Sequence, residues 1–173
     1  MQPALADSWQ TSEGGKRIVF HLRSGLTFSD GSSLRAADVV TSWLRVLAPA
    51  HPSQLASLLD DVVGARAYRE GSGSKSAVGV QALDDQQVAI DLVNPAADFA
   101  AIASSPTLAV VPPAIDSDAG ILLPHTFVGS GAYVLSDLTD TETTMTANPH
   151  YWGGAPPIEL SRWTVPIGGG PAQ

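Results

Sequence analysis

The stretch that decides the fold is FHLRSGLTFSDGSSLRAADVVTSWLRVL, residues 20–47. It starts as a strand-like alternation, turns at Phe-Ser-Asp-Gly, and ends in a pattern with apolar residues at three-to-four spacing. Asp38 would lie in the first helical turn, where a carboxylate favours the helix dipole. We therefore predict a tight turn followed by an amphipathic helix, whose buried face carries Ala36, Val39, Val40, Trp43 and Leu47.

Two β-hairpins are predicted, one that ends within this stretch and one that follows it along the chain. In the first, LADSWQ at residues 5–10 and RIVFHL at residues 17–22 flank the polar turn TSEGGK. In the second, alternating apolar residues over 78–82 and 88–92 flank the turn at Asp84 and Asp85. Each hairpin would bury one face.

The remaining elements complete one α+β unit. A second helical pattern runs from Leu55 through Ala67 and closes at Gly71, and a short helix after Pro95 would bury Phe99 and Ile102. Three further strands are predicted over residues 133–136, 143–147 and 158–165. The expected architecture is helices packed on a mostly antiparallel sheet.

Composition bounds the class of protein. The chain has 173 residues, the length of one domain, and its 44% hydrophobic and 15% charged residues are typical of a globular protein. The net charge of -8 argues against nucleic acid as a partner, because phosphate binding needs clustered Lys and Arg. The absence of cysteine excludes disulfides and thiolate chemistry. We find no export signal and no membrane-spanning run, and we expect that the chain is cut from its parent at both ends.

No catalytic, metal or cofactor site is predicted. Neither Ser130 nor Ser72 has the glycine spacing of a nucleophile elbow, and the glycine-rich pieces lack phosphate-loop spacing. The four histidines are far apart, without metal-ligand partners. The adjacent pairs Asp60-Asp61 and Asp84-Asp85 are interpreted as solvated helix-end and turn residues. Of the tryptophans, Trp9 and Trp43 are expected in the core.

Three segments together resemble the dipeptide, oligopeptide and nickel binding proteins known as family 5 solute-binding proteins. The first covers residues 5–47, with its hairpin, Phe-Ser-Asp-Gly turn and helix. The second runs from VVGARAYREG at residue 62 through VGVQALDDQQVAIDLVNP to Pro112. The third is VGSGAYVLSDL followed by ANPHYWGGAPPI, which resembles the family's Gly-Thr-Gly-Pro-Tyr and Asn-Pro-x-Tyr-Trp stretches. All three occur in family order and cover nearly the whole chain.

These motifs have structural explanations. Asp30 and Gly31 would form a tight turn through Asx hydrogen bonding and glycine's conformational freedom. Arg35 replaces the family's usual helix-capping Thr, which leaves Ser32 or Ser33 as substitute caps. Asn148 and Pro149 would end a strand, and the following Tyr-Trp pair would cover an exposed end of the core.

The resemblance implies the class II-like fold of periplasmic binding proteins, a clamshell of two lobes. Residues 1–128 would be the accessory subdomain of lobe I, and residues 129–173 the start of the main part of that lobe. The second lobe and the N-terminal strand region, which carry most ligand contacts in the family, would be missing. Within this chain, the loop AHPSQLAS resembles the place from which some relatives reach the ligand, and Gln54 is our candidate ligand-binding residue.

The function implied is the scaffold part of a non-catalytic, extracytoplasmic protein that captures peptides and delivers them to an ABC permease. An alternative is the solute-sensing domain of a transcription regulator, which a helix-turn-helix in the missing N-terminal part would indicate. A hydrolase is the third reading, and the absence of a nucleophile motif argues against it.

Overall fold

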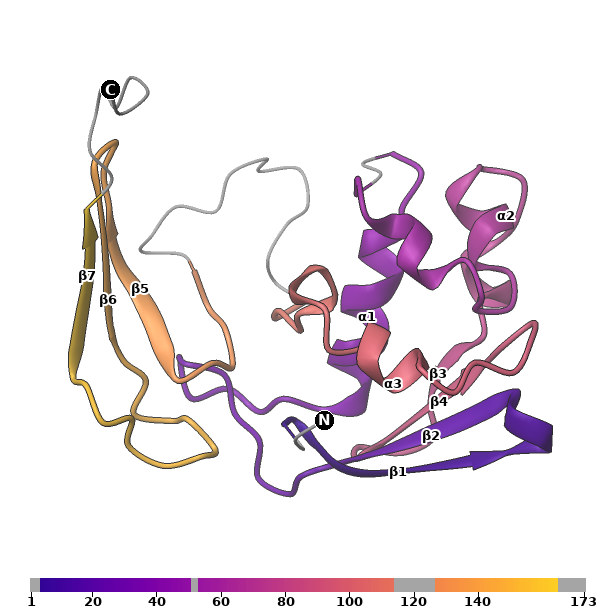
Figure 1. Cartoon of the computed structure of the whole chain (residues 1–173), viewed down its shortest axis with the longest axis horizontal. Helices are drawn as coiled ribbons and strands as arrows, with labels where there is room; N and C mark the ends of the chain where they lie inside the picture. The colour runs from indigo at the N-terminus through magenta and orange to yellow at the C-terminus, as the bar shows by residue number, and fades with distance from the viewer. Residues whose placement is uncertain (1–3, 51–52, 114–126, 165–173) are drawn as a thin grey trace, which may run out of the picture. The chain divides into compact units, whose positions relative to one another are not determined.

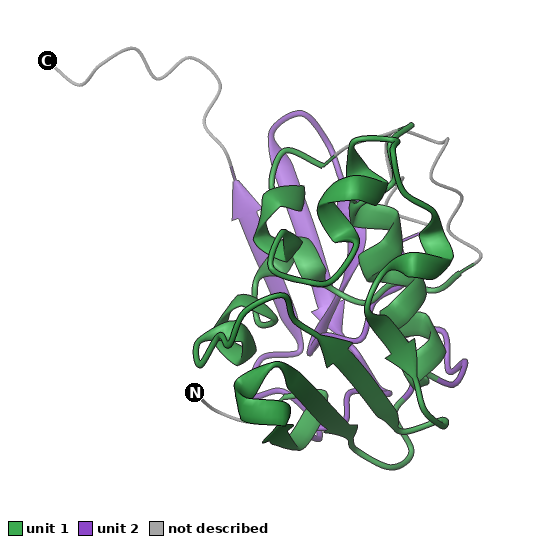
Figure 2. Ribbon diagram, turned by 90° about the vertical axis from the view of Figure 1, so that its right-hand side faces the viewer, with its two compact units in different colours: residues 1–26, 34–117 green, residues 27–33, 118–173 purple. Residues whose placement is uncertain are grey.

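The computed structural model describes residues 4–50, 53–113 and 127–164. It divides into two compact units, each of which has its own sheet (Figure 2). Unit 1 comprises residues 1–26 and 34–117, and unit 2 comprises residues 27–33 and 118–173. The α+β class is confirmed, but the prediction of a single unit on one sheet is wrong, because the C-terminal strands pair only with one another among the described residues.

Unit 1 is built on a four-stranded antiparallel sheet in the order β1-β2-β4-β3 (Figure 1). The strands are β1 (Ala6–Ser12), β2 (Arg17–Leu22), β3 (Val80–Ala82) and β4 (Gln87–Asp91). Both predicted hairpins are confirmed, and β2 pairs with β4 to join them. The alternation in β2 has the expected result, because Ile18, Phe20 and Leu22 are buried while the residues between them are partly exposed.

Helix α1 (Ala36–Val46) lies against β3 and β4 and closes the core of unit 1. Ala36, Val39, Trp43 and the following Leu47 are buried as predicted, whereas Val40 is only partly buried. The indole N–H of Trp43 donates to the carbonyl of Leu108 at 3.0 Å. Its ring meets the ring of Phe99 edge-on, with centroids 6.2 Å apart.

The start of α1 is stabilised by Asp38. The Arg35 backbone N–H donates to the Asp38 carboxylate at 2.7 Å. Asp38, the third residue of the helix, thus satisfies the backbone N–H of the residue just before the helix. Neither serine serves as the predicted substitute cap. The Ser32 hydroxyl donates to Asp30 at 2.6 Å, and Ser33 forms an isolated β-bridge with Thr27.

The long second helix predicted from Leu55 to Ala67 is wrong. The segment forms a 3-10 helix, η2 (Ala56–Leu59), then a β-bridge between Val62 and Leu92, and then the short helix α2 (Ala65–Arg69). The break is at Gly64, which has a left-handed φ of 70°. This φ lies outside the right-handed helical region, so the helix cannot continue through Gly64. A Cβ atom there would lie 2.4 Å from the Ala77 carbonyl oxygen, so the position admits only glycine.

Four short elements complete unit 1: η1 (Glu13–Gly15), η3 (Lys75–Ala77), α3 (Phe99–Ile102) and η4 (Pro106–Leu108). In α3, Phe99 is buried as predicted but Ile102 is only partly buried. Trp9 is 37% exposed, so its predicted place in the core is wrong. It pairs with Phe20 across the hairpin, but β1 is an edge strand and nothing among the described residues covers the indole fully.

Unit 2 contains a three-stranded antiparallel sheet in the order β5-β6-β7. Its strands are β5 (Tyr133–Leu138), β6 (Glu142–Ala147) and β7 (Leu160–Thr164), which confirms the three predicted strands apart from Val165, outside the described residues.

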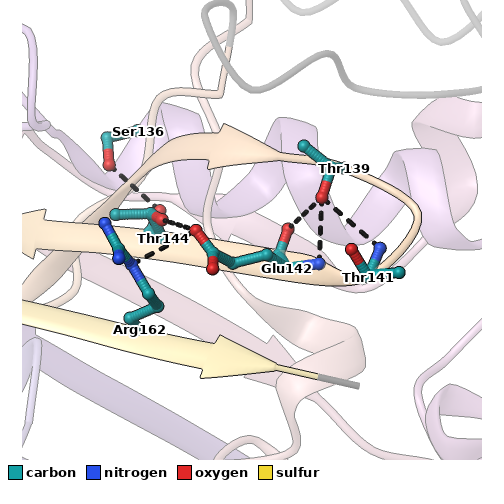
Figure 3. Close-up of polar contacts among 6 residues, drawn as sticks. All are labelled: Ser136, Thr139, Thr141, Glu142, Thr144 and Arg162. Carbon is teal, nitrogen blue, oxygen red and sulfur yellow. Dashed lines mark hydrogen bonds and ion pairs between the residues drawn. The ribbon is translucent and has the colours of Figure 1, made fainter. Parts of the chain in front are cut away.

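Polar contacts link the β5–β6 turn and the outer strand of this sheet (Figure 3). The Thr139 hydroxyl oxygen accepts from the Glu142 backbone N–H at 2.9 Å and closes the turn. The Glu142 carboxylate pairs with Arg162 on β7 at 3.2 Å and accepts from the Thr144 hydroxyl at 3.4 Å. These contacts join neighbouring strands at the turn end of the sheet.

Candidate functional site

The Phe-Ser-Asp-Gly turn, residues 28–31, belongs to unit 2 although it lies between two segments of unit 1. Its Phe28 side chain is buried, and the Phe28 carbonyl accepts from the Gly31 N–H at 3.0 Å. The Asp30 carboxylate accepts from the Ser32 backbone N–H at 2.9 Å, which is the predicted Asx hydrogen bond. Gly31 has a φ of 83°, a conformation that side chains rarely adopt.

The electrostatics of this turn centre on Asp30. The hydrogen bond from the Ser32 hydroxyl is the largest influence lowering the pKa of Asp30 below its usual 3.8, followed by the bond from the Ser32 backbone N–H. The positive charge of His150 lowers the pKa of Asp30 further. All three interactions favour the carboxylate over the neutral acid.

Within unit 2, direct hydrogen bonds join this turn to two later motifs, VGSGAY at residues 128–133 and NPHYW at residues 148–152. The Ser29 backbone N–H donates to the Gly129 carbonyl at 2.8 Å, and the Gly129 N–H donates back to the Ser29 hydroxyl at 3.3 Å. The Thr27 hydroxyl donates to the His150 carbonyl at 3.1 Å. We call this set of contacts, among residues 27–33, 129–131 and 148–151, the junction.

Asn148 organises the C-terminal part of the junction. It follows the end of β6, as predicted, and its side chain is 1% exposed. Its amide nitrogen donates to the Gly131 carbonyl at 2.8 Å, and its amide oxygen accepts from the His150 N–H at 2.9 Å. Both the donor and the acceptor of the buried amide therefore have hydrogen-bond partners. This arrangement indicates that Asn148 has a structural role.

The rings of Tyr151 and Trp152 lie 5.2 Å apart and are both partly exposed. The described residues contain no cluster of three or more His, Cys, Asp or Glu that could hold a metal ion. Chemically, the hydrogen bonds of the junction can hold three distant parts of the chain together.

Gln54, the residue predicted to contact a ligand, is exposed in the turn that precedes η2. The preceding His51 and Pro52 lie outside the described residues. Gln54 does not line either of the two hollows described below.

Unit 1 contains two hollows that the sequence reasoning missed. The first, the apolar hollow, has a volume of about 300 Å³. Residues 100–110 supply the largest part of its lining, and β1, β2 and α1 contribute further side chains, among them Trp9, Phe20 and Trp43. The second, of about 260 Å³, is lined by both polar and apolar residues at the C-terminal end of α1. The alternation in β2 indicated a buried face. It did not indicate that Phe20 and Leu22 on that face would line a hollow.

The structure shows hydrogen bonds or ion pairs for members of both adjacent acidic pairs, Asp60-Asp61 and Asp84-Asp85, and it corrects the prediction for Asp60. Asp84 accepts from the Gln86 N–H at 2.7 Å, as expected of a turn residue. Asp60 lies at the end of η2 as predicted, but it is not merely solvated, because its carboxylate pairs with Arg69 at 3.0 Å and Arg66 at 3.4 Å. No helix in the described part of the chain is long and apolar enough to cross a membrane.

Comparison with known proteins identifies the class. The model of the bacterial extracellular solute-binding proteins, family 5 Middle, matches residues 1–165. The chain belongs to this family of solute-binding proteins.

Its relatives include proteins named as periplasmic binding proteins. The chain is 36% identical over 156 residues to the probable deoxycholate-binding periplasmic protein YgiS of Escherichia coli, covering 87% of this chain and 29% of that protein. It is 31% identical over 170 residues to the periplasmic oligopeptide-binding protein OppA of Escherichia coli, covering 95% of this chain and 31% of that protein.

The fold is likewise that of a solved relative. The crystal structure of Haemophilus influenzae OppA in complex with RPPGFSPFR matches with a TM-score of 0.89 and 27% identity, over 95% of this chain and 33% of that one. The chain thus spans about a third of the length of the relatives it matches.

Proposed function

We propose that this chain is the scaffold part of the substrate-binding component of an ABC-type peptide importer. In this proposal the whole protein is an extracytoplasmic clamshell that captures peptides and delivers them to a membrane permease. The observation that carries the proposal is the family match over residues 1–165, which includes every residue of the junction. The names of the OppA relatives favour peptides as the solute.

The division of labour within the chain is part of the proposal. Residues 1–128 are the accessory subdomain of lobe I, and residues 129–173 begin its main part. The two compact units support this in outline, since the first four strands lie in unit 1 and the last three in unit 2. The turn at residues 27–33 would then be the point where the accessory subdomain is tied to the main part.

The chain itself carries no catalytic activity in this proposal. Its relatives are solute-binding proteins, and the junction uses its polar groups to hold the backbone. A null result with ester and peptide substrates is expected. None of the three relatives named above is a transcription regulator, so the regulator alternative has no observation in its favour.

Titration calorimetry of the full-length parent tests the proposal. Mixed di- to octapeptides should bind with micromolar or tighter affinity, because a closed pocket buries most of a small ligand. Deoxycholate serves as the competing solute, since one relative is named for it. Binding of deoxycholate without any binding of peptide would overturn the peptide assignment.

Gln54 is proposed to contact the ligand in the parent. Gln54→Ala should weaken peptide binding there, whereas Gln86→Ala, a matched change at another exposed turn, should leave it unaltered. Equal affinities of the two variants would remove Gln54 from the site without affecting the proposed function.

A further inference from the structure

The pairing of positive charges in this acidic chain is uneven. The chain has nine Lys and Arg residues against seventeen Asp and Glu. Most of the cations have partners: Arg17 with Asp91, Arg35 with Asp85, Arg66 and Arg69 with Asp60, and Arg162 with Glu142. Arg23 donates to the Ala4 carbonyl. No carboxylate pairs with Lys16, Arg45 or Lys75 in the part of the chain that the structure describes.

Two of these three cations line one hollow. Arg45, in the last turn of α1, and Lys75, the first residue of η3, both line the second hollow of unit 1. Tyr68, from α2, lines it as well, so three separate elements contribute polar side chains (Figure 1 shows α1 and α2). We call this the cationic hollow. Lys16, by contrast, is exposed in the turn of the first hairpin.

The rest of the cationic hollow is partly apolar, with Leu44, Ala48, Val111, Pro112 and Pro113 in its lining. Two like charges that share a hollow repel each other, and an anion placed between them relieves that repulsion. A carboxylate is the natural anion here, because guanidinium and ammonium groups form short, charge-assisted hydrogen bonds with it. The apolar wall offers burial to a hydrocarbon group attached to that carboxylate.

The size of the hollow restricts the ligand. Its volume of about 260 Å³ lies just below the range of pockets that hold drug-sized ligands, roughly 300–1,000 Å³. It would therefore admit a group the size of one ring rather than an oligopeptide.

We propose that the cationic hollow binds small carboxylates that carry an apolar group, through Arg45, Lys75 and Tyr68. The site lies wholly within unit 1 and needs no second lobe. It goes beyond the proposed importer function, and neither proposal depends on the other.

The test uses the chain of 173 residues and phenylacetate as the probe, followed by amide chemical shifts in NMR spectra. A ligand with about ten heavy atoms should bind with a dissociation constant on the order of 1 mM. Phenylacetamide has the same shape without the charge and should bind about tenfold more weakly, because it lacks the charge-assisted contacts. The shifts should be confined to residues around Arg45, Tyr68 and Lys75.

Two variants and a matched control separate specific binding from general attraction. Arg45→Gln and Lys75→Gln should each weaken phenylacetate binding about fivefold, the upper range for a partly exposed ion pair. Lys16→Gln removes the same charge from the only other lysine and should leave the affinity unchanged. These side chains are partly or fully exposed, so the variants should keep the fold, which the unperturbed spectrum of β1–β4 verifies.

Three outcomes would overturn the proposal. The first is equal binding of phenylacetamide, which would mean that the hollow is merely apolar. The second is an equal loss in Lys16→Gln, which would mean that only the net charge of the chain matters. The third is shifts around the apolar hollow, near Trp9 and Phe20, in place of the cationic one.

Discussion

Trp43 shows how a single side chain is fixed in the core of unit 1. Its exposed fraction is 4%, and its ring packs on Phe99. The N–H of its indole ring donates to the Leu108 carbonyl. A buried indole without such an acceptor would lose the hydrogen bond that it makes with water in the unfolded chain. Burial and hydrogen bonding therefore favour the same position of the ring.

Trp43→Ala is expected to lower the free energy of unfolding by about 3–5 kcal/mol, as for other buried aromatic residues. Urea denaturation followed by circular dichroism measures this loss. Trp9→Ala is the matched control and should cost less, because that ring is 37% exposed. A loss below about 1 kcal/mol for Trp43→Ala would contradict the described core.

Asp30 provides a pH-dependent signal within the junction. Because the folded pKa of Asp30 lies below 3.8, its contribution to stability is present above that pH and is lost as pH falls through the folded pKa. An NMR titration of the Asp30 carboxyl carbon should give a midpoint below 3.8.

Ser32→Ala removes the strongest of the interactions that lower the Asp30 pKa, so the midpoint should rise toward 3.8. Ser33→Ala leaves all of these interactions in place and should not move it. If the midpoint of Asp30 lies above 3.8 in the unmodified chain, the Asx turn is not formed in solution.

At the residue scale, the sequence predicted what depends on neighbours along the chain. The Asx bond of Asp30 and the burial of Ala36 follow from local spacing, and both are confirmed. The exposure of Trp9 depends on which strand lies at the edge of the sheet, and alternation within β1 holds no information about that.

At the scale of elements, the segment from Leu55 to Arg69 shows where periodicity misleads. Its apolar residues recur at helical spacing, yet Leu59 and Val62 are buried in different local structures. The bridge between Val62 and Leu92 and the close approach of Gly64 to Ala77 come from partners outside the segment. Tertiary contacts thus outweigh the helical pattern, which carries only a modest intrinsic preference.

Gly64→Ala should destabilise the chain by about 2 kcal/mol or more, because a left-handed φ costs about 1–2 kcal/mol and the new Cβ would clash with backbone. Gly71→Ala is the control, since Gly71 has a φ of 75° with nothing within 4 Å of its Cβ position. It should incur the conformational cost alone. Thermal unfolding of both variants compares them, and a Gly64→Ala variant as stable as Gly71→Ala would show that the Ala77 contact is not formed.

At the scale of the whole molecule, the isolated chain should bind peptides only with millimolar or weaker affinity, a free energy no better than about -4 kcal/mol. Under the proposed function the chain is one wall of a clamshell, which leaves the polar groups of ligand and protein facing water, so little offsets the cost of immobilising the peptide. Calorimetry with mixed di- to octapeptides measures this, with the parent as positive control. Micromolar binding by the chain alone would mean that residues 51–57 form a site of their own.

The candidate sites were predictable in unequal measure. The three motifs of the junction were visible in the sequence, but nothing in their spacing indicated that Ser29 would bond to Gly129. The cationic hollow was not predicted, because Arg45, Tyr68 and Lys75 belong to three elements and form no pattern along the chain. Only the folded chain shows which cations have been left without carboxylates.

The placement of residues 27–33 in unit 2 has a consequence for protein synthesis. This turn leaves the ribosome long before its partners, since Ser29 and Gly129 are 100 residues apart. At a translation rate of about 5–20 residues per second, the turn waits roughly 5–20 s for Gly129, and longer for Asn148 and His150. Meanwhile the strands and helices of unit 1 can already assemble on both sides of it. Unit 2 is therefore completed around a loop whose two ends are already anchored in the nascent chain.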